Sequence, residues 1–411
     1  MKVNFYDVVD VISGGTPRTD VGEFWNGEIP WLSVVDFAKS VKYVYDTEKH
    51  ITELGLKNSN TKLLNIDDII ISARGTVGAI AMLKIPMAFN QSCFGLRAKR
   101  EFMNQDYLFY FLKYYMENLK KKTQGSVFST INLETFRMID FELPDTNTQI
   151  KISKILSCLD SKIENNNKIN AELESMAKTL YDYWFLQFEF PNENGKPYKS
   201  SGGKMVWNEE LKREIPEGWE VRTVKDCADV VSGYPFKTET YSKDGKYKIY
   251  TIGNVQDGYI DDTCPNKIDF IPDDMDRGCI LKPCDIIMSL TGNVGRVGLV
   301  YTKNALLNQR VLKVEPLEGY HNFLYLLFRN SSFSRVMQRI ASGTSQKNLS
   351  PNQVCDFKFA IPKKSLLDLF NKKVNGFIKA IVNNLSQNQE LTSLRDFLLP
   401  LLMNGQVKFK D

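Results

Sequence analysis

The sequence predicts an α+β protein in which two α/β domains form a tandem repeat with pseudo-twofold symmetry, separated by two long helices that pair as a coiled coil. Three observations lead to this fold class. Landmark residues recur at a nearly constant displacement, and short β-branched segments ending in glycine turns fill most of each copy. An apolar stripe with helical spacing then closes each copy. A chain of 411 residues is also long enough for two to three folding units.

The same pattern of residues occurs twice along the chain. Asn90-Gln91 recurs as Asn308-Gln309, at a displacement of 218 in the numbering. The segment 68–72, followed by Gly75 and Gly78, corresponds to the segment 285–289, followed by Gly292 and Gly295, at a displacement of 217. The remaining landmarks, at displacements of 218 or 219, are Ser13-Gly14 with Ser232-Gly233, Gly125 with Gly343, and Pro144 with Pro362. This constant order indicates an internal duplication.

The first part of each copy is predicted to be rich in strands. The runs 66–72 and 286–289 are short and β-branched, and a glycine-containing turn follows each of them. We expect the paired glycines to supply positive φ or a close approach of the backbone to another group. Two interpretations stay open at this stage, an ordinary turn and a lining for a DNA phosphate or base edge.

The second part of each copy is predicted to be a long helix with one apolar face. Each helix alone would expose this stripe to water, so we expect the two copies to bury it against each other. Asn166 and Asn384 fall at corresponding places on the stripe, where a polar residue costs stability but fixes the register. The predicted seam is Ile152, Leu156, Leu159, Ile163, Asn166, Leu173, Met176 and Leu180 in the first helix, and Phe370, Val374, Phe377, Ile381, Asn384, Leu391, Leu394 and Leu398 in the second.

The first helix ends in an aromatic run, residues 181–185, for which core packing and docking of a partner protein are both open interpretations. Residues 191–218 are rich in Pro, Gly, Asn, Ser and Lys and are predicted to be an exposed linker.

Bulk composition excludes several classes of protein. The formal net charge of +4 is compatible with a polyanionic partner but is far from that of a histone-like protein. No apolar run reaches the roughly 18 residues of a membrane span, and the start of the chain lacks a signal-peptide pattern. The seven cysteines form no C-x-x-C pair, which argues against a zinc site and fits a reducing cytoplasm.

The common catalytic motifs are missing from the sequence. It contains no G-x-x-x-x-G-K-[ST] phosphate loop, no G-x-S-x-G elbow and no H-E-x-x-H pair. It also lacks the Pro-Pro-aromatic motif of amino-methyltransferases and a convincing acidic cluster with lysine of the kind that metal nucleases use. We therefore expect no catalytic site and no metal site in this chain.

Several segments, taken together and in order, carry a resemblance to a known family. They are Ser13–Pro17, Ile29–Leu32, Ser72–Gly78, Asn90-Gln91, Trp184-Phe185, Phe188–Pro191, Gly195–Gly203, Ile215–Glu220 and Leu398–Gln406. Over essentially its whole length the sequence resembles the specificity subunits of type I restriction-modification enzymes, which serve host defence.

The resemblance implies two target-recognition domains and two conserved helical regions whose helices lie antiparallel. We expect the first recognition domain at 1–147, the central helix at 148–190, the linker at 191–218, the second recognition domain at 219–364, and the C-terminal helix and tail at 365–411. The implied partners are double-stranded DNA, two methyltransferase subunits and two restriction subunits. S-adenosylmethionine, ATP and Mg²⁺ would then be used by those partners, and the complex would work in the cytoplasm.

The two copies differ at positions where base reading is expected. Arg favours guanine and Asn or Gln favours adenine in the major groove, with about 1–3 kcal/mol of discrimination per bidentate contact. Asn90-Gln91 and Asn308-Gln309 are identical in both copies, so we expect them to hold structure or to contact backbone. Lys120-Lys121-Lys122 is either a phosphate contact or a solvated helix face. The candidate DNA-binding residues are Gly15, Thr16, Arg18, Arg74, Thr76, Asn90, Gln91, Gln124 and Ser126 in the first copy, and Tyr234, Lys237, Asn254, Thr291, Asn293, Asn308, Gln309, Arg310, Thr344, Ser345, Gln346, Lys347 and Asn348 in the second.

Two other hypotheses remain open from the sequence. A coiled-coil scaffold with two protein- or glycan-binding domains would bind its ligand without salt-dependent DNA affinity. A stand-alone nuclease would cut DNA with a metal ion, which the missing acidic cluster disfavours.

Overall fold

The computed structural model describes residues 1–38, 42–122, 130–263, 265–343 and 346–407. The chain divides into two compact units, and each is described by itself. Unit 1 consists of residues 1–165 and 388–411, and unit 2 consists of residues 166–387. None of the described helices is long and apolar enough to cross a membrane.

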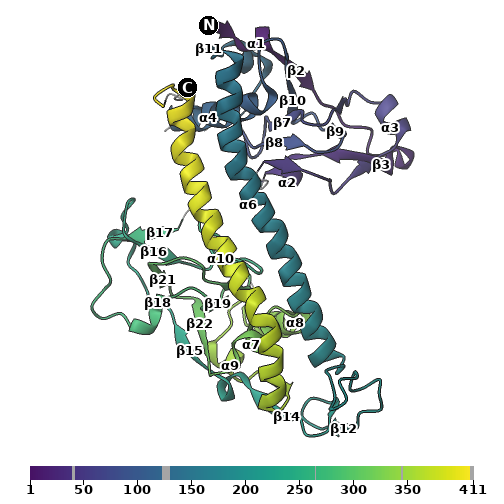
Figure 1. Ribbon diagram of the computed structural model, residues 1–411, viewed down its shortest axis with the longest axis vertical. Coiled ribbons are helices and arrows are strands. Elements are labelled where there is room, and N and C mark those ends of the chain that lie inside the picture. The colour runs from purple at the N-terminus through teal and green to yellow at the C-terminus, as the bar shows by residue number, and fades with distance from the viewer. Residues whose placement is uncertain (39–41, 123–129, 264, 344–345, 408–411) are drawn as a thin grey trace. The chain divides into compact units, whose positions relative to one another are not determined.

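The described strands of unit 1 form three sheets, and Figure 1 shows their place in the chain. Its largest sheet has the strand order β2 (Val9–Ser13), β10 (Cys93–Ala98), β7 (Ile69–Ser72), β8 (Ile80–Leu83) and β4 (Tyr43–Val44). A second sheet has the order β5 (His50–Ile51), β3 (Trp25–Leu32), β9 (Met87–Phe89) and β6 (Leu63–Leu64), and β1 (Lys2–Asn4) pairs with β11 (Asp140–Glu142). The helices of this domain are α1 (Phe5–Val8), α2 (Val34–Phe37), α3 (Glu53–Lys57), α4 (Gln105–Lys122) and α5 (Leu133–Arg137).

Within the described residues, unit 2 repeats this arrangement for every strand of unit 1 except β4. The order β15 (Ala228–Ser232), β22 (Val311–Pro316), β19 (Ile286–Ser289) and β20 (Val297–Leu299) matches β2-β10-β7-β8. The order β17 (Asn266–Ile268), β16 (Tyr247–Tyr250), β21 (Ala305–Leu307) and β18 (Ile280–Leu281) matches β5-β3-β9-β6, and β14 (Glu220–Thr223) pairs with β23 (Lys358–Ile361). Helices α7 (His321–Phe328), α8 (Ser331–Ile340) and α9 (Pro351–Cys355) complete the domain. The predicted duplication is therefore confirmed at the level of topology.

Strands β7 and β19 show why the sequence is continuously apolar there rather than alternating. Ile69 and Ile71 enter one core cluster of unit 1, while Ile70 enters a second cluster on the other face of the strand. In unit 2, Ile286 and Ile287 divide in the same way between two clusters. A strand covered on both faces needs apolar side chains at every position.

The two long helices are α6 (Thr146–Tyr181) and α10 (Lys364–Met403), and they pair antiparallel. In unit 1 the start of α6, with Ile152 and Leu156, shares a core with Leu399 and Leu402 near the end of α10. In unit 2 the end of α6 packs instead against the start of α10. The predicted coiled-coil helices are thus confirmed.

Two predicted seam residues are wrong. Met176 and Leu394 are 52% and 45% exposed, whereas the neighbouring Ala177 and Arg395 are buried. The buried face of α6 also includes Asp160, so a count of apolar residues alone places the stripe slightly off its true position. Leu159, Leu173, Leu180, Phe377, Asn384, Leu391 and Leu398 are half-buried, and Ile152, Leu156, Ile163, Asn166, Phe370, Val374 and Ile381 are buried as predicted.

The register of the pair is marked by amides. The Asn166 side chain donates to the Gln387 side chain at 2.8 Å, and the Asn384 side chain donates to the Asn170 side chain at 2.9 Å. Both contacts lie within unit 2. Each contact pairs side-chain groups that would be costly if left unpaired on a buried face. Contacts of this kind are what a register-fixing role of Asn166 and Asn384 requires, and that role stays a prediction.

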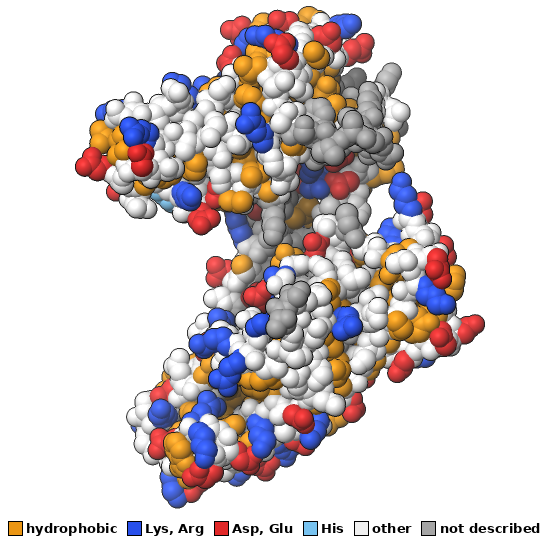
Figure 2. All heavy atoms as spheres, turned by 180° about the vertical axis from the view of Figure 1, so that it is seen from behind, with side chains coloured by type: hydrophobic (Ala, Val, Ile, Leu, Met, Phe, Trp, Pro, Cys, Tyr) orange, Lys and Arg blue, Asp and Glu red, His pale blue; other side chains and the backbone are white. Residues whose placement is uncertain are grey.

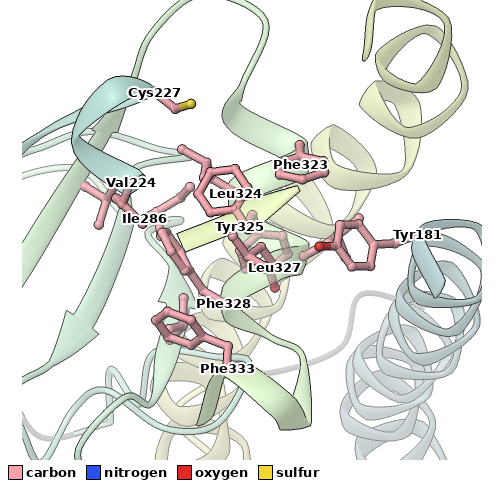
Figure 3. Close-up of a cluster of buried hydrophobic side chains, with 14 of the residues drawn as sticks. Tyr181, Val224, Cys227, Ile286, Phe323, Leu324, Tyr325, Leu327, Phe328 and Phe333 are labelled. Carbon is pink, nitrogen blue, oxygen red and sulfur yellow. The ribbon is translucent and has the colours of Figure 1, made fainter. Parts of the chain in front are cut away.

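The aromatic end of α6 belongs to the core of unit 2. Tyr181, Trp184 and Phe185 are buried, and Figure 3 shows Tyr181 beside side chains of α7 such as Tyr325 and Leu327. The helix ends in a wider π-helical turn, Asp182–Leu186, so the predicted helix range of 148–190 runs too far.

The segment 191–218 is more ordered than the predicted linker. Strands β12 (Met205–Asn208) and β13 (Arg213–Pro216) form an antiparallel hairpin within it. Phe188 and Phe190 flank the Trp219 ring at centroid distances of 5.3 and 5.4 Å. These ring contacts hold the two ends of the segment together, which composition alone did not indicate.

Candidate nucleic-acid interface

The turn after the central strand has the same geometry in both units. Gly75 and Gly78 have φ of 74° and 76°, and Gly292 and Gly295 have φ of 73° and 77°. These are left-handed conformations that favour glycine, so the expected positive φ is confirmed. In unit 2 the Ser289 hydroxyl donates to the backbone oxygen of Asn293 at 2.6 Å and fixes the turn from inside.

In unit 2 this turn meets the segment that follows α8. The Thr291 hydroxyl donates to Asn348 Oδ1 at 2.9 Å, and Arg310 Nη1 approaches the same oxygen at 3.4 Å. The Gly292 amide donates to the Lys347 carbonyl at 2.9 Å, and the Asn348 side chain donates to the Gln346 carbonyl at 3.2 Å. The structure therefore brings together five predicted residues from three separate parts of the sequence.

These residues differ in how far they are exposed to solvent. Thr291 is buried, so its hydroxyl positions Asn348 rather than facing solvent. Asn293, Arg310, Gln346 and Lys347 are exposed. Arg310 also has a positive φ of 72°, which is uncommon for a residue other than glycine. Its side chain is exposed to solvent.

The Asn-Gln pairs connect the two sheets of each unit. Asn308 is buried and its amide donates to the Tyr250 carbonyl at 3.1 Å, while the Asn90 amide donates to the Leu32 carbonyl at 3.0 Å. A Cβ on Gly233 would lie 1.9 Å from the Asn308 carbonyl oxygen, and one on Gly14 would lie 2.3 Å from the Asn90 oxygen. A structural role was expected for these Asn-Gln pairs because they are identical in both copies, and this close packing supports that expectation.

In unit 1 the equivalent surface is a hollow of about 470 Å³. Its lining includes Gly14, Arg74 and Gln91, together with Asn132 and Glu134, which the sequence reading did not single out. Asn132 caps α5 and could have been recognised as the residue before a short helix. Arg74 is exposed and has no carboxylate partner within the described part of the chain.

Other predicted residues of unit 1 lie around this hollow or outside it. Gln91 is exposed and accepts from the Thr16 hydroxyl, and Gly15 is buried against the backbone of Asn60 and Thr61. Thr76 is exposed on the turn. Arg18 pairs with Asp20 at 2.7 Å on an exposed surface, which is a weak interaction.

Asn254 requires a correction. It is buried, its side-chain oxygen accepts from the Thr251 amide at 2.9 Å, and its side-chain nitrogen donates to the Asp261 carbonyl at 2.8 Å. Both ends of its amide are therefore used to shape a loop rather than to read a base.

Tyr234 donates to Asp274 at 2.8 Å, and Lys237 and Gln309 are exposed. Gln124, Ser126, Thr344, Ser345 and the side chains of Lys120, Lys121 and Lys122 lie outside the described residues.

Charges of both signs are intermixed over the face of the molecule shown in Figure 2. No region of uniform positive charge therefore marks a binding surface for a polyanion on this face, and individual cationic side chains must be considered instead. Within the described residues, several cations of unit 2 have no carboxylate within ion-pair distance, and five of them lie on or near the turn and α8. They are Arg296, Arg310, Arg335, Arg339 and Lys347. The described residues also hold no group of three His, Cys, Asp or Glu side chains that could bind a metal ion.

Comparison with known families agrees with this architecture. The family model described as "Type I restriction modification DNA specificity domain" matches residues 1–175 and 216–393, once for each copy. The chain therefore belongs to the family of type I restriction-modification specificity subunits.

Particular relatives extend along the whole chain. The MjaIX specificity subunit of Methanocaldococcus jannaschii is 29% identical, and the alignment covers 98% of this chain and 93% of that protein. The MjaVIII specificity subunit of the same organism is 25% identical over 100% of this chain and 93% of its own length. The crystal structure of a type I S subunit from M. genitalium shares the fold with a TM-score of 0.58 and 16% identity, covering 100% of this chain and 96% of that one.

Proposed function

We propose that this chain reads a bipartite, asymmetric DNA sequence, with one half of the target contacted by each recognition domain. The observation that carries the proposal is that one topology occurs twice while the residues on equivalent turns differ. Arg74 corresponds to Thr291, and Thr76 corresponds to Asn293. Two copies related by an approximate dyad can meet the two strands of a duplex in equivalent poses. Because their exposed side chains differ, they would select different bases.

Within each domain we propose a division of labour between reading and support. Arg310 in unit 2 and Arg74 in unit 1 are exposed guanidinium groups suited to guanine O6 and N7. Asn348 holds Arg310 in place and is itself held by Thr291. Asn90 and Asn308 would support the reading surface without discriminating among bases.

The outer faces of α6 and α10 are proposed to dock two methyltransferase subunits. Met176 and Leu394 are separated by the same displacement as the other landmarks, so they occupy equivalent positions in the repeat, and both are exposed. Near Met176, an apolar groove of about 540 Å³ is lined by Leu180, Tyr183 and Phe377. Exposed apolar grooves of this kind are typical of protein interfaces.

We further propose that catalysis belongs to the partners. Methyltransferase subunits would use S-adenosylmethionine, and two restriction subunits would use ATP and Mg²⁺ for translocation and cleavage. The specificity subunit would supply DNA recognition and assembly, in the cytoplasm.

Domain exchange tests the proposal. Residues 1–147 are replaced by the corresponding domain of a relative with another target, and methylation by the assembled complex is mapped at single-base resolution. We expect one half of the recognised sequence to change and the other half to stay the same. An unchanged target would contradict the proposal. Absence of salt-dependent DNA binding in the methyltransferase complex, with affinity for a protein or glycan instead, would favour the scaffold hypothesis.

A further inference from the structure

One cavity of unit 2 lies between α6, α8 and the β19–β20 turn. Its volume is about 770 Å³, and it lies wholly within the one unit. Its lining includes Asn293 and Arg296 from the turn, Lys178 from α6, and Arg329 and Arg335 from the region of α7 and α8.

The charges on the cavity wall are unbalanced. The lining holds four cationic side chains and two carboxylates, Glu174 and Asp257. Arg329 contacts both of them, through an ion pair with Asp257 and at 3.9 Å from Glu174. Burial raises the pKa of Glu174 above its usual range.

The remaining guanidinium groups have neutral partners. Arg296 donates to the Gln256 side chain at 2.8 Å, and Arg335 donates to the Ser331 carbonyl at 3.3 Å. Within the described residues neither has a carboxylate within ion-pair distance. Two guanidinium groups with a surplus of positive charge favour a phosphate, which accepts the paired donors of a guanidinium.

This set of cations occurs in only one of the two copies. At the displacement of the repeat, the positions of Arg296, Arg335 and Lys178 are occupied in the other copy by Ala79, Glu117 and Asp396. Packing requirements common to both domains therefore do not explain these three residues. They are specific to the second recognition domain.

We propose that this cavity binds a phosphate group through Arg296 and Arg335, with Lys178 adding positive charge, and that the phosphate belongs to the DNA backbone beside the second half of the target. The inference rests on the proposed function and adds a backbone contact to it. Arg296 follows directly on the turn that carries Asn293. A phosphate held there would fix the position of the duplex against the reading residues of the same domain, because backbone contacts position and base contacts specify.

The test measures the salt dependence of DNA binding. The full chain is assembled with its methyltransferase subunit, and affinity for its mapped target is followed from low to high salt. Each lost phosphate contact makes the negative slope of log K against log salt shallower by about 0.9. We expect R296Q/R335Q to reduce the size of the slope by about 0.9, because the one phosphate held by both side chains is lost. The methylated sequence should stay the same, because no base contact is removed.

A matched control removes the same amount of charge elsewhere in unit 2. Lys225 and Lys358 are exposed and pair with Asp356 and Glu210 at 3.2 and 2.7 Å. The K225Q/K358Q variant should keep the wild-type slope. The single variant R335Q changes only an exposed helix residue, and it should reduce the size of the slope in the same direction, by at most about 0.9, even if the double variant proves unstable.

The remaining outcomes are distinguishable. A wild-type slope and affinity for both R296Q/R335Q and R335Q would overturn the inference while leaving the proposed function intact. Pyrophosphate binding that is lost in R296Q/R335Q, with an unchanged DNA slope, would show a site for free phosphate and would overturn its assignment to DNA. Failure of the wild-type complex to bind DNA would instead contradict the proposed function.

Discussion

At the scale of single residues, the most informative group is a buried ion pair in unit 1. Arg395 of α10 lies 2.8 Å from Asp160 of α6, and both side chains are at least nine-tenths buried. The Tyr110 hydroxyl of α4 donates to the other Asp160 oxygen at 2.6 Å. The equivalent positions in the second copy are the apolar Ile378 and Ala177. One end of the helix pair is thus held by charge and the other by apolar packing.

Removing one member of this pair should be costly. R395A leaves Asp160 buried without its counter-ion, and the expected loss in the free energy of unfolding is about 3–5 kcal/mol. Urea unfolding followed by circular dichroism measures the change. The double variant D160I/R395A copies the residues of the second repeat and removes both charges, so it should lose less than R395A alone. A double variant that is less stable than the single one would contradict this account.

Arg310 provides a second prediction at the residue scale. R310A should reduce discrimination in the second half of the target by about 1–3 kcal/mol, because the guanidinium held by Asn348 is removed. Binding to targets with single-base changes measures this loss. The first half should be read as before, and K358A, which alters an exposed lysine paired with Glu210, should leave both halves unchanged. Equal loss at both halves would indicate a general defect instead of altered reading.

At the scale of elements, the sequence predicted both long helices and the strand-turn-strand units. It did so because apolar spacing and glycine turns are local signals. It misplaced Met176 and Leu394 because the buried face of the helix pair contains Asp160 and Arg395, which a search for apolar residues passes over. These two residues pair with each other across the long helices, far apart along the chain, so only the folded chain shows the pairing.

Helix length is the third prediction. Seven residues inserted between Lys162 and Ile163 in α6, with seven between Leu391 and Thr392 in α10, preserve the apolar faces because seven residues make nearly two turns. The added rise is about 10 Å, equivalent to about three base pairs at about 3.4 Å each. Methylation mapping should show the same two half-sequences with a spacer about three base pairs longer. The same insertion in α6 alone should disrupt helix pairing. An unchanged spacer would contradict a measuring role for the helices.

At the scale of the whole molecule, the repeat made the architecture predictable. Two copies at a nearly constant displacement imply two similar domains and two pairing helices, and the strand orders bear this out. The proposed reading surface was predicted less completely. Thr291 and Arg310 were singled out because the copies differ there, and Asn348 because it lies in a polar loop. Arg296 and Arg335 were not singled out, because their shared cavity depends on the packing of α8 against its surroundings. Asn254 was misassigned because a polar side chain in a loop can serve the loop itself.

The same repeat leads to the last prediction, which concerns assembly. Met176 and Leu394 are equivalent and exposed, so a charge at either position should disturb one docking surface while costing the fold little. M176D and L394D should each bind one methyltransferase subunit in place of two, as measured by native mass spectrometry, and M176D/L394D should bind none. S175A alters the residue beside Met176 without adding a charge and should bind two subunits. If each single variant still binds two subunits, the methyltransferase docks on another surface. If either one binds none, the two surfaces do not act independently, because a dyad with separate sites requires that the undamaged one still be filled.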